Sequence, residues 1–114
     1  MEDHDAARLT GAAVAYQGKV YVPVAGWEEN RANDPKYVCC TMRGSVVALR
    51  IRDGSQVWKT YMTDAPKQTG VSDAGTPTYG PSGAGIWSAP PLDRERGLRY
   101  AGTGAHYSQP ANER

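Results

Sequence analysis

The chain has 114 residues, which is enough for one small domain or for a part of a larger one. Leu, Ile and Val total only 15, there is no Phe, and Gly and Pro supply 13 and 8 residues. The formal net charge is only +1, so the composition lacks the high charge of a disordered chain, and 3 Trp and 7 Tyr provide most of the bulky apolar material. No apolar run approaches the ~20 residues of a transmembrane helix, and no basic stripe indicates a nucleic-acid partner.

Strand-like segments follow one another along the chain, and helical periodicity is nearly absent. Gln17-Gly18 and Asp53-Gly54 separate runs that are rich in β-branched and aromatic residues, which is typical of hairpin turns. The charged tip 93–97 separates a third pair of runs and must face water. The predicted antiparallel pairs are 12–16 with 19–24, 45–51 with 56–61, and 86–92 with 98–102.

Two long connections lie between these pairs. Residues 25–43 carry an aromatic residue, two adjacent acids and two adjacent cysteines, and residues 62–84 are rich in Thr, Gly, Ser, Asp and Pro. Structureless loops of this length inside a compact domain are usually either functional or disordered. Their aromatic, acidic and thiol content favours a functional role.

The chain contains a short internal sequence repeat. Residues 18–22 (GKVYV) recur as residues 97–101 (GLRYA), offset by 79 positions, and each copy follows a strand rich in small residues. Repeated hairpin units of this kind predict a propeller or a solenoid. The predicted fold class is therefore all-β, a partial β-propeller with four antiparallel strands per blade. One blade spans about 11–61, and the next begins near 85 and runs to about 104.

We expect residues 1–114 to be a fragment of a single propeller domain. The acidic, polar start Met1–Asp5 is no signal peptide, and residues 108–114 end without a closing element. A single blade also leaves both faces of its sheet exposed, so it relies on its neighbours to bury them.

One segment resembles the repeat of enzymes that use pyrroloquinoline quinone (PQQ). The run Gly44–Leu49, followed by Asp53–Trp58, matches that repeat at Ala48, Gly54 and Trp58. The resemblance implies that Trp58 packs between blades. Arg50 stands where the repeat usually has Asp, and Asp53 stands where it usually has Thr.

A wider set of motifs resembles the quinoprotein alcohol dehydrogenases, and within them the polyvinyl-alcohol dehydrogenase branch. This resemblance covers about His4 to Tyr107 and implies an eight-bladed propeller that holds PQQ and Ca²⁺ near its axis, of which this chain would form about two blades. The motifs that carry it are Val20–Val24, Glu28-Glu29, Tyr37–Leu49, Gly80–Ala84, Trp87–Pro90 and Tyr100–Gly104.

The resemblance implies four PQQ-binding positions. Thr10 would hydrogen-bond a PQQ carboxylate, although its hydroxyl could equally serve an ordinary turn. Ala25 and Gly26 would lie beneath the quinone, where their small size admits the ring. Trp87 would form the floor on which the planar ring stacks, with an inter-blade core position as the alternative.

The resemblance also implies a calcium site. Glu28 aligns with the carboxylate that ligates the ion, and Glu29 takes that role if the register slips by one residue; the alternative is a pair of solvated loop acids. Ala105 stands where the family commonly has Asn or Asp, so one oxygen ligand is missing. Either His106 or a water compensates, although imidazole is a poor calcium ligand, or metal binding is impaired in this chain.

Cys39 and Cys40 are adjacent, and related quinoproteins carry such a vicinal disulfide against the cofactor, though at a different point relative to the blade motifs. The resemblance therefore implies a disulfide here and leaves open whether it touches PQQ. No spacing in the chain indicates a haem c attachment or a zinc site. His4 and His106 lie near the two ends, and neither is assigned a catalytic role.

The leading hypothesis is a fragment of a periplasmic PQQ- and Ca²⁺-dependent alcohol dehydrogenase that passes electrons from an alcohol to a cytochrome c. No catalytic residue is assigned, because the family's Asp base is not among the matching residues; the fragment alone should be inactive. The main alternative is a non-catalytic propeller of the same repeat that serves as a scaffold for protein partners. A self-standing small β-protein is disfavoured by the thin core.

Overall fold

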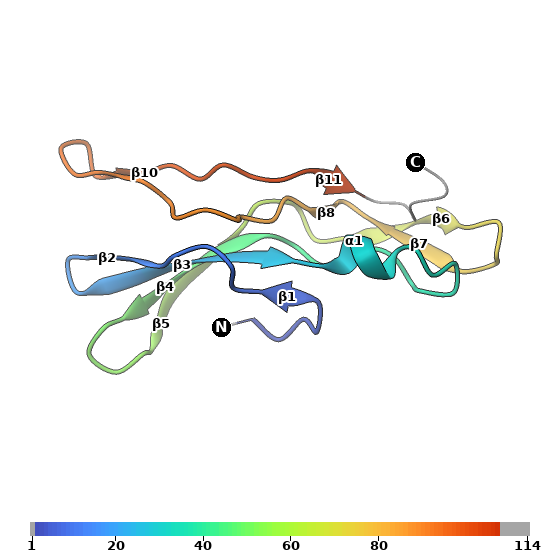
Figure 1. Ribbon diagram of the computed structural model, residues 1–114, viewed down its shortest axis with the longest axis horizontal. Helices are drawn as coiled ribbons and strands as arrows, with labels where there is room; N and C mark the ends of the chain where they lie inside the picture. The colour runs from blue at the N-terminus through green and yellow to red at the C-terminus, as the bar shows by residue number, and fades with distance from the viewer. Residues whose placement is uncertain (1, 108–114) are drawn as a thin grey trace.

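A computed structural model describes residues 2–107, an elongated molecule of 50 × 26 × 21 Å (Figure 1). The described chain consists of short strands and one helix of four residues, so the prediction of a mostly β protein with little helix is confirmed. None of its helical structure is long and apolar enough to cross a membrane. Residues 108–114, which the sequence predicts to end without a closing element, lie outside the described residues.

Four consecutive strands form an antiparallel meander in which each strand pairs with the next. Its first turn has positive φ at both Gln17 (47°) and Gly18 (71°), which matches the right-handed twist of the flanking strands. Gly54 supplies a positive φ of 71° in the second predicted turn. The first two predicted hairpins are therefore confirmed. The strands are β2 (Val14–Tyr16), β3 (Lys19–Gly26), β4 (Ser45–Arg50) and β5 (Gln56–Tyr61), and β1 (Ala7–Arg8) pairs with the far end of β3.

Both faces of the central strand β4 are covered by segments from outside the meander. Val47 packs in a cluster with Ala6 of the N-terminal segment. Val46 and Ala48 alternate with Val47 along the strand, so they face the other way and pack with Ile86. The meander is thus enclosed between the start of the chain and its last third, as the two flanking traces in Figure 1 show.

The two long connections are not structureless, so the prediction of extended loops is wrong in part. The first contains a helical turn, and the second forms a hairpin and one more short strand. Pairing between distant segments explains the difference, because Cys39 pairs with Thr78 and Arg43 with Gly83, both in parallel bridges that no local pattern reveals. The additional elements are α1 (Glu28–Arg31), β6 (Lys67–Val71), β7 (Pro77–Gly80) and β8 (Ser82–Gly83).

The third predicted hairpin is much shorter than expected. Only β9 (Leu92–Asp93) and β10 (Leu98–Arg99) pair, and residues 86–91 belong to no strand. Pro90 and Pro91 lack the N–H groups that a ladder needs. The chain then returns to pair β11 (His106–Tyr107) with β8.

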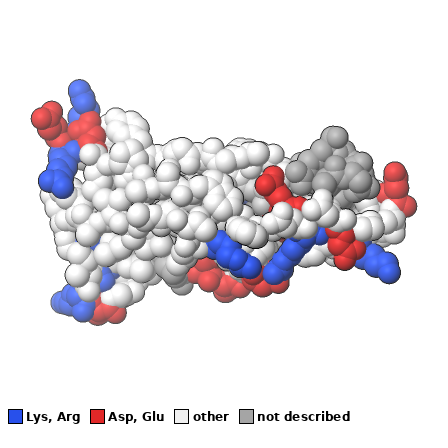
Figure 2. All heavy atoms as spheres, in the orientation of Figure 1, with Lys and Arg blue, Asp and Glu red and all other residues white. Residues whose placement is uncertain are grey.

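The four-stranded meander has the strand order of a propeller blade, but its closure into a ring with further blades stays a prediction. The domain limits of 1–114, with blades at about 11–61 and 85–104, stay predictions as well. Figure 2 shows charged side chains at the two ends and along one long edge, with a broad uncharged area between them on the face in view. An uncharged face of this kind is compatible with packing against another layer of the same fold.

A backbone contact joins the meander to the last third of the chain. The Gly44 N–H donates to the Gly83 carbonyl over 2.7 Å. A Cβ on Gly44 would lie 1.9 Å from the Ala84 carbonyl oxygen and 2.5 Å from its carbonyl carbon. Since these obstacles are backbone atoms, the contact requires glycine at position 44.

We expect Gly44→Ala to destabilise the protein by about 1–3 kcal/mol or more, because the added methyl group forces the two backbones apart. Gly70→Ala is the matched control, since a Cβ there meets nothing closer than the Thr78 hydroxyl at 3.6 Å. Urea unfolding of both variants measures the difference. Equal stability of Gly44→Ala and the wild type would contradict the close approach.

Candidate functional site

A shallow hollow lies where the end of β3, the start of α1 and the segment after β8 meet. Its lining residues are Gly26, Trp27, Glu29, Asn30 and Trp87, and we call it the Trp87 hollow. The side chains of Trp27 and Trp87 are 51% and 46% exposed. Half-exposed tryptophans at one concave place are uncommon on a surface and mark it as a candidate binding site.

Two glycines lie directly against the Trp87 indole. A Cβ on Gly104 would lie 2.9 Å from Trp87 Nε1, and a Cβ on Gly85 would lie 3.4 Å from the same atom. The Gly104 N–H donates to the Gly85 carbonyl over 2.8 Å, so a hydrogen bond joins the two backbone segments that lie beside the indole. Gly85 also approaches Ala25, whose Cα would be 3.2 Å from its Cβ. The absence of side chains at both glycines lets the ring lie close to the backbone.

The structure places Gly26 and Trp87 at the same hollow, and Ala25 lies against Gly85 beside it. Ala25 and Gly26 are buried at the end of β3. Thr10 is exposed in the loop between β1 and β2. Its neighbour Gly11 packs against the Ser88 backbone, with 3.1 Å from a built Cβ to the Ser88 carbonyl, which keeps the Thr10 loop beside the Trp87 segment. The assignment of all four positions to PQQ stays a prediction.

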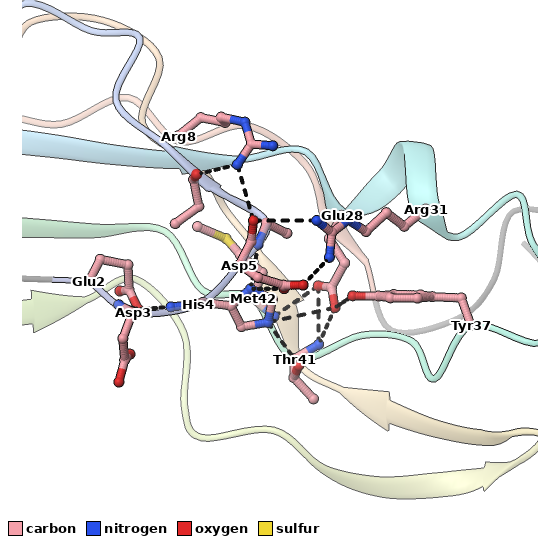
Figure 3. A network of polar contacts seen from close by, with 12 residues as sticks. Glu2, Asp3, His4, Asp5, Arg8, Glu28, Arg31, Tyr37, Thr41 and Met42 are labelled. Atoms are coloured by element: carbon pink, nitrogen blue, oxygen red, sulfur yellow. Dashed lines mark hydrogen bonds and ion pairs between the residues drawn. The ribbon is translucent and has the colours of Figure 1, made fainter.

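Glu28 occupies a different environment, because its side chain is fully buried. One carboxylate oxygen, Oε1, accepts from the Thr41 backbone N–H (2.8 Å) and from the Tyr37 hydroxyl (3.2 Å). The other, Oε2, accepts from the Met42 N–H (2.8 Å) and at 3.1 Å from that of Thr41. Figure 3 shows Tyr37 and Thr41 directed at the Glu28 carboxylate. We call this arrangement the Glu28 network.

His4 and Tyr37 complete the Glu28 network. His4 Nδ1 accepts from the Ala6 N–H over 3.1 Å, so Nε2 carries the proton of the neutral ring and donates to Thr41 Oγ1 at 3.0 Å. Burial raises the pKa of the Tyr37 hydroxyl and the Glu28 charge raises it further, which keeps Tyr37 a neutral donor.

An ion pair fastens α1 to the N-terminal segment on the outside of this network. Arg31 donates to the Asp5 carboxylate over 2.5 Å, and this hydrogen bond lowers the pKa of the Asp5 carboxyl. Asp5 is 74% exposed, so solvent screens the pair and its contribution to stability is small. The buried contacts of Glu28 therefore matter more for the position of α1.

The residues around Glu28 do not fit a calcium ion. Every contact just described places a hydrogen-bond donor on a carboxylate oxygen, where a cation would need open coordination sites and further oxygen ligands. Within residues 2–107 no three His, Cys, Asp or Glu side chains gather closely enough to hold a metal. The acid that lines the Trp87 hollow is Glu29, which the sequence names only as the fallback. Calcium ligation by Glu28 stays a prediction that this geometry does not support.

Ala105 and His106, the positions at which the resemblance leaves a calcium ligand missing, do not line the Trp87 hollow. Ala105 is exposed, and its carbonyl accepts from the Ala84 N–H over 2.9 Å. His106 lines a separate hollow that includes Asp64 and Pro81 and does not include Trp87. The described geometry therefore offers no compensation by His106 at the Trp87 hollow.

Cys39 and Cys40 are joined as a vicinal disulfide, as the resemblance implies. Both are fully buried, and they pack with Ala32 and Tyr107 and against Tyr37. Neither cysteine lines the Trp87 hollow. The disulfide thus belongs to the packing beside the Glu28 network, and its contact with a cofactor stays untested.

Trp58 lies against Tyr21, with ring centroids 5.9 Å apart, in the cluster that also contains Ile86. It therefore packs between the meander and the last third of the chain, as an inter-layer tryptophan should. This contrast with half-exposed Trp87 separates a core tryptophan from a candidate binding tryptophan.

Comparison with known proteins identifies relatives of the chain. The polyvinylalcohol dehydrogenase of a Pseudomonas species is 35% identical over 114 residues, which are 99% of this chain and 18% of the relative. The polyvinylalcohol dehydrogenase of Sphingopyxis sp. (strain 113P3) is 38% identical over 109 residues, 95% of this chain and 17% of the relative. No protein-family model and no solved structure matches. The chain is homologous to a segment of polyvinylalcohol dehydrogenases and spans less than a fifth of their length.

We expect Glu28→Gln to destabilise the protein by about 1–3 kcal/mol, because the new amide group turns a donor toward the N–H groups of Thr41 and Met42. Glu29→Gln is the matched control, since the neighbouring side chain is exposed and its neutralisation should change stability by no more than about 0.5 kcal/mol. Urea unfolding at one pH compares the two. Equal effects would show that the Glu28 carboxylate does not hold α1.

The disulfide predicts a simple result for thiol labelling. Protein unfolded in urea with an alkylating reagent, and without reductant, should carry no label on Cys39 or Cys40. The same sample after reduction should take up two labels, which serves as the control. Mass spectrometry of the peptide that contains both cysteines counts the labels in each sample. Two labels before reduction would contradict the disulfide.

Proposed function

We propose that the chain is a segment of a quinoprotein alcohol dehydrogenase that oxidises polyalcohols such as polyvinyl alcohol. The homology to two proteins named polyvinylalcohol dehydrogenase supports this proposal. The observation that carries it is that Gly26 and Trp87, which are distant in sequence, line one hollow, with Ala25 against Gly85 beside it. We propose further that the meander is one blade of a β-propeller whose next blade begins near residue 85.

The described residues fit the ring system of PQQ. The half-exposed Trp87 indole offers a flat apolar surface. Gly85 and Gly104 lie against its Nε1 atom and leave room for the ring because they have no side chain. Gly26 lines the same hollow without a side chain of its own. Thr10 is not among the lining residues, so its proposed hydrogen bond to a PQQ carboxylate rests on the resemblance alone. When bound, PQQ supplies the two-electron acceptor for alcohol oxidation.

The chain's own residues bind and orient rather than catalyse. Trp87 fixes the plane of the ring, and the small residues at the end of β3 leave room for it. None of these side chains is a general base, so we propose that the base comes from another part of the complete protein. Calcium remains part of the proposed cofactor set, but no step is assigned to it here because Glu28 does not fit it.

The remaining proposals concern partners and location. The substrate would be an alcohol, the electron acceptor a cytochrome c, and the compartment the periplasm, where a buried disulfide such as Cys39–Cys40 persists. No nucleic-acid partner is proposed. A non-catalytic scaffold of the same fold would keep the inter-layer Trp58 but would have no need of an exposed Trp87 above two glycines.

The proposal predicts how glycine substitutions change PQQ affinity in the full-length protein. Gly104→Ala should weaken binding about tenfold, because its Cβ would lie 2.9 Å from Trp87 Nε1 and tilt the ring. Gly102→Ala is the matched control, since nothing lies within 4 Å of a Cβ there. Quenching of tryptophan fluorescence by added PQQ measures both affinities. Absence of PQQ binding by the wild type would favour the scaffold alternative.

A further inference from the structure

The two turns of the meander lie side by side and border a second hollow. The Ile51 N–H donates to the Gly18 carbonyl over 3.0 Å, which joins the two turns, and the Gly54 N–H donates to the Arg50 carbonyl over 2.8 Å. Figure 1 shows both turns at the same end of the molecule, together with the turn that precedes β10. The hollow is lined by Gln17, Gly18, Lys19, Arg50, Arg52 and Val57. Half of these described lining residues are cations, and none of them is an acid.

The cations continue as a row across the sheet. Lys19 and Arg50 are directly opposite each other in β3 and β4, and Tyr16 of β2 is opposite Lys19 on its other side, so the three side chains share one face. The guanidinium of Arg94, from the turn between β9 and β10, lies over the Tyr16 ring, 5.6 Å from its centroid. We call Arg94, Lys19, Arg50 and Arg52 the basic row.

Charge is poorly compensated within the basic row. The Asp53 carboxylate pairs with Arg52 at 3.4 Å and also accepts from the Ser55 N–H (3.0 Å) and hydroxyl (2.6 Å). Among residues 2–107 the Lys19 side chain has no hydrogen bond or ion pair, although it lies opposite Arg50. Like charges directly opposite each other on adjacent strands are destabilising. The fold therefore keeps two cations together at a cost in stability.

The neighbouring turn does not neutralise the basic row. Its Asp93 carboxylate pairs with Arg96 at 2.8 Å, and Glu95 is exposed next to Arg94. Asp53 and Glu95 together leave the four cations with an excess of two positive charges, whereas the whole chain has a net charge of +1. The positive charge of the chain is thus concentrated at this end.

The basic row is separate from the Trp87 hollow. Lys19 is the first residue of β3 and Gly26, which lines the Trp87 hollow, is the last. A strand rises by about 3.3 Å per residue, so the two positions lie on the order of 20 Å apart. A ring bound at Trp87 would not reach the basic row, whose charge is available to a different partner.

We propose that the basic row is the docking site for an acidic segment of a partner protein, whose carboxylates pair with Lys19 and Arg50. Cations on successive strands follow one another along a line, which suits several carboxylates on an extended chain better than one compact anion. Val57 in the same hollow provides an apolar contact for the methylene groups of acidic side chains. The proposal goes beyond the proposed function and does not depend on it.

Fluorescence anisotropy of a labelled decaglutamate peptide, titrated with the full-length protein, tests the docking site. The double substitution Lys19→Gln and Arg50→Gln should weaken binding about tenfold. Lys36→Gln with Lys67→Gln is the matched control, because it removes the same charge from exposed side chains outside the basic row. Raising the ionic strength to about 0.15 M, where the Debye length is about 8 Å, should also weaken the binding of the wild type.

Urea unfolding of the same variants provides a second readout. The double substitution at Lys19 and Arg50 removes a contact between like charges, so the variant should unfold at the same urea concentration as the wild type or at a higher one. A lower unfolding midpoint would show that these two side chains hold the fold together, and would overturn their assignment to a partner.

Three results of the peptide titration would also overturn the docking site: no binding of decaglutamate by the wild type, equal weakening by the two pairs of substitutions, or equally tight binding of decaglutamine. Displacement of the peptide by inorganic phosphate at constant ionic strength would assign the basic row to a small anion instead. Tighter binding of a single-stranded DNA oligonucleotide that depends on Lys19 would assign it to a nucleic acid, and either result would replace the acidic segment.

Discussion

The buried carboxylate of Glu28 is the constraint on which the candidate site depends. A charged side chain removed from water costs several kcal/mol unless hydrogen bonds compensate it. Here the compensation comes from the backbone N–H groups of Thr41 and Met42 and from the Tyr37 hydroxyl. Thr41 and Met42 directly follow the buried disulfide and Tyr37 lies just before it, so α1 cannot shift without leaving a buried charge unpaired. Trp27 and Glu29 flank Glu28 and line the hollow, so the contacts that fix Glu28 also fix their backbone positions.

Close backbone contacts take the place of a large aliphatic core. The clusters on the two faces of β4 contain small residues such as Ala6 and Ala48, and segments distant in sequence approach through glycines. Gly44 meets the backbone of Ala84, and Gly104 lies beneath the Trp87 ring. A chain with few Leu, Ile and Val can pack in this way, because the absence of Cβ atoms lets backbones and ring faces touch directly.

The elements that sequence analysis predicts correctly are those encoded by local turns. Gln17-Gly18 and Asp53-Gly54 mark the two hairpins of the meander, and each acts within a few residues. The pairing of Cys39 with Thr78 connects segments 39 residues apart and leaves no local signal, so the elements of the long connections are missed. Glu28 and Glu29 pose the same difficulty for the site, since adjacent acids have equal chemistry and only the fold decides which one is buried. The partner of the carboxylate, a pair of backbone N–H groups, has no signature in the sequence at all.

The two adjacent acids, Glu28 and Glu29, therefore have different roles. The buried Glu28 carboxylate accepts hydrogen bonds inside the protein, whereas the exposed Glu29 side chain lines the Trp87 hollow. The fold, and not the chemistry of the residue, therefore decides the role of each acid. The carboxylate beside the backbone N–H groups of Thr41 and Met42 holds α1 in place, and the side chain one residue further on borders the candidate site.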